Sequence, residues 1–158
     1  MKCIIVYYSF SGNTRKVSEL LSEHLRKKSE VDILELKATD ESTSFFKQAL
    51  RALVRTKADV GTINFDLSKY DLICIGTPVW AFGPAPAMNT YLDKCKGFQG
   101  KDTIVFTTYG SGTGNNHCIN YIKSILNKKG AKGCKSFSLP GARAKDRDYV
   151  EFVINKHN

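Results

Sequence analysis

Apolar runs of strand length alternate with stretches of helical periodicity, and this alternation limits the fold more than any other feature of the sequence. The runs expected to form strands are 3–8, 31–36, 72–75, 103–108 and 134–139. Apolar residues at helical spacing predict helices at 14–28, 43–57, Pro84–Pro86 to Cys95, 118 to Gly130, and 149–154. We therefore predict an α/β fold, a three-layer doubly wound five-stranded parallel sheet, in one domain over residues 1–158.

Composition is ordinary for a globular protein, with 42% hydrophobic and 25% charged residues. No apolar run approaches the roughly 18 residues that span a membrane, and residues 1–4 lack the apolar core of a signal peptide. Five cysteines form no Cys-x-x-Cys pair, which argues against a disulfide framework and a zinc site. We expect a cytoplasmic protein with no bound metal.

The net charge of +9 is unusual and bears on the choice of partner. A basic balance fits either nucleic acid or an acidic protein. The cations are spread along predicted helix faces, and their tightest clusters are Arg26–Lys28 and the late loop with Arg143, Lys145 and Arg147. This spread disfavours nucleic acid and leaves an acidic protein as the expected partner.

Small hydroxyl residues and a glycine follow the first predicted strand directly, as Ser9-Phe10-Ser11-Gly12-Asn13-Thr14. Backbone N–H groups at a helix start and hydroxyl donors can converge there on one anion. A nucleoside-triphosphate loop would need Gly-Lys-Ser/Thr, and a dinucleotide loop would need three spaced glycines. The remaining ligand is a lone phosphomonoester such as that of flavin mononucleotide (FMN); the alternative is an ordinary turn and helix cap.

Two further loops fall at the same predicted edge of the sheet, after the third and fourth strands. The first contains Thr77-Pro78-Val79-Trp80 with the only tryptophan, which could stack on a planar ring or plug the core. The second, residues 107–116, holds three glycines within five residues. Glycines let the backbone approach a ligand closely; a plain flexible turn is the alternative.

Together the three loops resemble those of the flavodoxin family, over essentially the whole chain. The resemblance implies strand order 2-1-3-4-5, one non-covalent FMN and electron transfer through the exposed flavin edge. The residues matching the phosphate loop are Ser9, Ser11, Gly12, Asn13 and Thr14, with Thr77 as a supporting hydroxyl. Those matching the ring-side loop are Pro78, Val79, Trp80 and Ala81, and those matching the pyrimidine loop are Thr108, Tyr109, Gly110 and Gly112.

The chain departs from that family in two ways. Electron-carrying flavodoxins are very acidic, whereas residues 72–92 and 103–122 here contain no Asp, Glu, Lys or Arg. Flavodoxins also carry a glycine after the ring-side aromatic, where a peptide flips toward flavin N5, and this chain has Ala81. A non-glycine in such a conformation costs about 1–2 kcal/mol.

Three functions follow as expectations. The first is an FMN-binding redox protein that mediates electron transfer with an acidic redox partner protein. The second is an FMN-dependent NAD(P)H or quinone reductase, in which Arg143, Lys145 and Arg147 would meet a cofactor phosphate. The third is a non-redox module that holds another phosphate ligand. The flavin would carry the chemistry, so we expect no catalytic side chain. The helix at 43–57 would cover the sheet, lid the flavin or form a dimer contact.

Overall fold

Strands and helices alternate in the computed structural model, which describes residues 1–37, 63 and 65–157. The strands are β1 (Lys2–Tyr8), β2 (Glu30–Leu36), β3 (Leu72–Trp80), β4 (Gly83–Pro84), β5 (Asp102–Tyr109) and β6 (Gly133–Pro140). The helices are α1 (Asn13–Arg26), α3 (Pro86–Lys94), α4 (Asn115–Lys128) and α5 (Arg147–His157), with a 3-10 turn η1 (Gly141–Arg143). The helix predicted at 43–57 lies outside the described residues.

Five of the strands form a parallel sheet in the order β2-β1-β3-β5-β6. Without β4, this is the predicted order 2-1-3-4-5, so the α/β doubly wound prediction is confirmed. The two-residue β4 is an addition, antiparallel to the end of β3, with Trp80 opposite Gly83. Pairing with β4 and β5 carries β3 on to Trp80, past its expected end at residue 75.

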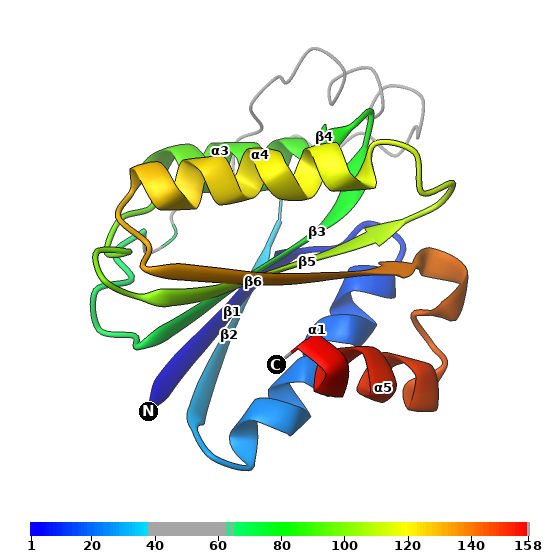
Figure 1. Ribbon diagram of the computed structural model, residues 1–158, viewed down its shortest axis with the longest axis horizontal. Helices are drawn as coiled ribbons and strands as arrows, with labels where there is room; N and C mark the ends of the chain where they lie inside the picture. The colour runs from blue at the N-terminus through cyan, green and yellow to red at the C-terminus, as the bar shows by residue number, and fades with distance from the viewer. Residues whose placement is uncertain (38–62, 64, 158) are drawn as a thin grey trace.

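Among the described residues, helices α3 and α4 cover one face of the sheet, and α1 and α5 cover the other (Figure 1). Strand β1 shows how the sequence produces the two cores, because successive side chains point to opposite faces. Ile4 and Val6 pack in the core under α3 and α4, whereas Cys3 and Ile5 pack in the core under α1 and α5. A strand buried on both faces must be apolar throughout, which explains the continuous run at residues 3–8.

Parallel strands place their carboxyl ends at one edge of the sheet. The register pairs Pro78 of β3 with Thr108 of β5, so the loops that follow β3 and β5 leave the sheet at the same height. Strand β1 lies beside β3 and delivers the Ser9–Thr14 loop to the same edge. The sequence thus gathers its three unusual loops at one place.

In the described part of the chain, no helix has the length and apolar character needed to cross a bilayer.

Candidate functional site

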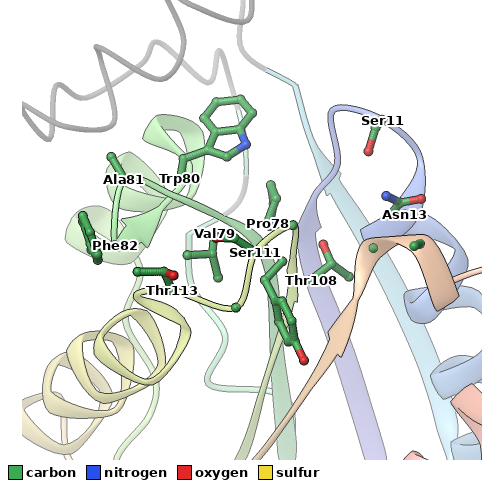
Figure 2. Close-up of a pocket in the computed structure, with 15 residues that line it drawn as sticks. Ser11, Asn13, Pro78, Val79, Trp80, Ala81, Phe82, Thr108, Ser111 and Thr113 are labelled. Atoms are coloured by element: carbon green, nitrogen blue, oxygen red, sulfur yellow. The ribbon is translucent and has the colours of Figure 1, made fainter.

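A cavity of about 660 Å³ opens at the carboxyl edge of the sheet, between the loops that follow β1, β3, β5 and β6 (Figure 2). Ser11 and Asn13 stand on one side of it, and Ala81 and Phe82 stand on the other. Its walls are formed by Ser11, Asn13, Pro78, Val79, Trp80, Ala81, Phe82, Thr108, Tyr109, Gly110, Ser111, Gly112, Thr113, Gly141 and Ala142. The structure therefore brings together residues from all three loops singled out in the sequence.

Most of the predicted site residues line this cavity, but Ser9, Gly12, Thr14 and Thr77 do not. The Thr14 side chain is buried, and its hydroxyl shares a 2.8 Å hydrogen bond with the hydroxyl of Thr108. This contact ties the start of α1 to the end of β5. The Ser9 hydroxyl accepts a hydrogen bond from the Arg15 N–H at 3.2 Å. In the structure, Ser9 and Thr14 shape the loop, whereas Ser11 and Asn13 face the cavity.

The start of α1 has the features of an anion-binding helix end. Gly12 is the N-cap and adopts φ 85°, a left-handed conformation that a glycine takes without strain. The first turn of the helix carries no acidic residue, and its first N–H groups have no acceptor within the helix. The Arg15 side chain is paired with Glu35 rather than turned to the loop. Backbone dipoles and small polar side chains would therefore receive the anion here.

Thr77, predicted as a supporting hydroxyl for the phosphate loop, does not line the cavity. Its side chain is fully buried, and its hydroxyl accepts a hydrogen bond from the Ala85 N–H and donates one to the Pro78 carbonyl, each at 3.1 Å. Both bonds hold the segment that returns from the β3–β4 turn. The Thr77 hydroxyl is therefore bonded within the hairpin beside the cavity.

Trp80 lies in the core and also borders the cavity. The side chain is only 8% exposed and belongs to the core under α3 and α4, yet it also lines the cavity. Its indole contacts Tyr8 and Phe10 edge-on, with ring centroids 5.8 and 5.7 Å apart. The tryptophan is thus packed in place, with part of its surface left for a ligand.

The turn between β3 and β4 has an uncommon backbone. Ala81 has φ 45° and Phe82 has φ 67°, and these two residues connect the paired positions Trp80 and Gly83. Positive φ at both central residues of a two-residue hairpin is the geometry of a type I′ turn. The strain expected at Ala81 is therefore present, and it extends to Phe82.

Phe82 contacts the glycine-rich loop, and this contact was not predicted from the sequence. An added Cβ at Gly114 would come within 2.2 Å of the Phe82 ring and 2.8 Å of its Cα. The first turn of helix α4 adds a hydrogen bond, in which His117 Nδ1 lies 2.9 Å from the Phe82 carbonyl oxygen. His117, which was not singled out in the sequence, therefore contacts the turn that borders the cavity.

The loop after β6 also reaches the cavity, through Gly141 and Ala142. At Gly141 an added Cβ would lie 2.8 Å from the Asn13 side-chain nitrogen, so a glycine lets Asn13 fit there. Ser111 and Thr113 are further lining residues that the sequence analysis did not name. A signal for the β6 loop was present in the sequence, since Pro140-Gly141 directly follows the predicted last strand.

The cavity lining is uncharged: none of the lining residues in the described part of the chain is Asp, Glu, Lys, Arg or His. The basic late loop is engaged elsewhere. Arg143 pairs with Asp146 at 2.7 Å and lies over the Tyr149 ring, and the hydrogen bond from this arginine lowers the pKa of the Asp146 carboxyl. Arg147 is paired with Glu23 and Glu151. These contacts count against Arg143 and Arg147 as receptors for a cofactor phosphate.

The residues present fit FMN. The start of α1, with Ser11 and Asn13, offers donors for a phosphomonoester without requiring a metal. Trp80, Val79 and Tyr109 offer apolar surface to a flat ring system. Gly110 and Gly112 border the same cavity and bring backbone close to it.

Comparisons with known proteins agree with this geometry. A family model described as Flavodoxin matches residues 2–151. A flavoprotein from Lactobacillus acidophilus, solved in complex with FMN, is 26% identical, with a TM-score of 0.69 over 93% of this chain and 98% of that one. Oxidised Flavodoxin 2 from Bacillus cereus shares the fold at 19% identity and a TM-score of 0.60, covering 99% of each chain. An NADH:FMN oxidoreductase in its apo form shares it at 15% identity and a TM-score of 0.61, over 100% of this chain and 91% of that one. The chain belongs to the flavodoxin family.

Proposed function

We propose that this chain is an FMN-dependent electron-transfer protein whose redox partner is acidic. The observation that supports this most strongly is the cavity itself, which combines a helix N-terminus free of acidic residues with an aromatic wall on a flavodoxin fold. FMN is the ligand that matches both ends of the cavity. The similar flavoprotein from Lactobacillus acidophilus was solved with FMN bound.

The protein would bind the cofactor at both ends. Ser11, Asn13 and the first N–H groups of α1 would hold the phosphate, and Trp80 and Tyr109 would border the ring. When bound, FMN accepts and donates the electrons. The protein positions the ring, excludes water from its buried edge and sets the electrostatic field around it.

The charge distribution supports an acidic partner. The chain carries a net charge of +9, while the lining of the cavity is neutral. A positive protein attracts an acidic one over distances of about 10 Å at moderate salt, and this raises the rate of encounter. An uncharged lining also lacks the carboxylates that would repel an anionic reduced flavin. The five cysteines, which all lie in the described residues, form no disulfide, and this fits a reducing compartment such as the cytoplasm.

The test is anaerobic electron transfer from the photoreduced, FMN-loaded protein. We expect fast oxidation by an acidic acceptor protein, slowing as salt is added, and slower oxidation by a basic cytochrome c. NADH and NADPH are added separately to the oxidised protein. Multiple-turnover oxidation of either nucleotide with a quinone acceptor would overturn the carrier proposal in favour of a reductase. A purified protein that takes up no FMN would contradict both and favour the non-redox phosphate-binding module.

A further inference from the structure

The Ala81–Phe82 turn is held in a conformation that neither residue favours. Both have positive φ, where a residue with a Cβ is strained and glycine, asparagine or aspartate is usual. Strained backbone persists only when surrounding contacts determine it, and such strain clusters at functional sites. Ala81 and Phe82 line the cavity beside Trp80, so contacts that hold this turn also shape the flavin site.

Two contacts, one from helix α4 and one from its N-cap residue Gly114, hold the Ala81–Phe82 turn. His117 Nδ1 lies 2.9 Å from the Phe82 carbonyl oxygen, and Phe82 packs over Gly114, where there is no room for a Cβ. On the near side, Thr77 accepts a hydrogen bond from Ala85 just after β4. The hairpin and the glycine-rich loop are therefore joined by direct contacts.

We propose that His117 is a positioning residue for the flavin site. By binding the Phe82 carbonyl it fixes the type I′ turn, directs that carbonyl to α4, and sets which peptide groups of the turn can meet the flavin. This inference rests on the proposed FMN function and adds a residue whose side chain does not itself line the cavity. His117 acts on the cofactor through the backbone of Phe82.

The contact also determines the tautomer of His117. A carbonyl oxygen can only accept a hydrogen bond, so the proton of the neutral imidazole must sit on Nδ1. Nitrogen-15 NMR of the imidazoles tests this on the unmodified protein, with His24 and His157 as the other histidines of the chain. We expect neutral His117 in the Nδ1–H form. A neutral His117 protonated on Nε2 would overturn the proposal.

The functional consequence is tested with His117→Ala, with His117→Asn as the conservative variant, whose side-chain amide can donate to the same carbonyl. His157→Ala is the matched control, because His157 is exposed in the last turn of α5. We expect His117→Ala to weaken FMN binding about fivefold, the effect of one hydrogen bond, and to shift the midpoint potential of the bound flavin. His117→Asn should restore both values, and His157→Ala should change neither.

The same variants are compared without FMN through the emission of Trp80, the only tryptophan. We expect His117→Ala to shift this emission and His117→Asn to restore it, because the turn begins directly after Trp80. An unchanged emission and an unchanged midpoint potential in His117→Ala would overturn the proposal. If His117 carries its proton on Nδ1 but the protein binds no FMN, the proposed function is wrong and the contact between His117 and Phe82 is still supported.

Discussion

Replacing Gly114 with alanine tests how closely the two walls of the flavin cavity are joined. Gly114 has φ 79°, and its Cβ position lies 2.2 Å from the Phe82 ring and 2.8 Å from the Phe82 Cα. Gly100 provides a matched control, because it has φ 70° with no atom within 4 Å of its Cβ position. Both alanines suffer the left-handed penalty of about 1–2 kcal/mol, but only the one at 114 also collides with a neighbour.

The collision adds a second cost. Overpacking of this kind destabilises by about 1–3 kcal/mol, and each kcal/mol corresponds to roughly 2–4 °C of Tm in a chain of this size. Gly114→Ala should therefore melt roughly 2–12 °C below Gly100→Ala. Because the collision includes the Phe82 Cα at 2.8 Å, the backbone of the turn must move. Gly114→Ala should therefore also weaken FMN binding, whereas Gly100→Ala should not.

Calorimetric melting of the FMN-free proteins and FMN titration of both variants measure the two effects separately. Equal Tm values for the two variants, together with unchanged FMN affinity in Gly114→Ala, would refute the packing of Phe82 over Gly114. A lower Tm with unchanged FMN affinity would show that the contact stabilises the fold without shaping the cavity.

Three further outcomes are expected. Asn13→Ala should weaken FMN binding more than riboflavin binding, because riboflavin has no phosphate for the start of α1; equal losses would place the phosphate elsewhere. FMN should quench the fluorescence of Trp80, which lines the cavity, and unchanged emission on titration would assign Trp80 to the core alone. Burial, and then the hydrogen bond to Asp32, raises the pKa of Tyr70 from 10.0 to about 12. The protonated form is therefore favoured in the folded state, and this contribution to stability is complete below pH 10 and lost as pH rises toward 12. Tyr70→Phe should make alkaline unfolding less steep over that range, and an identical pH profile would contradict the shift.

The sheet could be predicted from the sequence because its strands are buried on both faces. Such strands are apolar throughout, as at residues 3–8, and their order followed from the family resemblance of the loops that connect them. The β3–β4 hairpin could not be predicted in this way. The two central residues of a type I′ turn are usually Asn-Gly or a similar pair, and Ala81-Phe82 does not match this preference. Its conformation depends on Gly114 and His117, which are distant in sequence.

At the cavity too, the features that could not be predicted from the sequence depend on contacts between residues distant in the chain. Loop positions could be assigned because carboxyl ends of parallel strands meet at one edge, and Ser11, Asn13 and Trp80 line the cavity as this reasoning predicts. Which way a hydroxyl points within a loop depends on partners elsewhere in the fold. Thr14 bonds to Thr108, and Thr77 bonds to the backbone of Ala85, and no local pattern indicates either bond.

The packing of Trp80 has a consequence for the thermodynamics of cofactor uptake. Its indole is only 8% exposed and already contacts Tyr8 of β1 and Phe10 of the Ser9–Thr14 loop. Ordering a large side chain at an interface ordinarily costs about 0.5–1.5 kcal/mol at the moment of binding. Here that entropy is lost when the chain folds, before any ligand arrives. The aromatic wall is therefore preorganised, and the loop that would receive the phosphate is in contact, through Phe10, with the residue that would meet the ring.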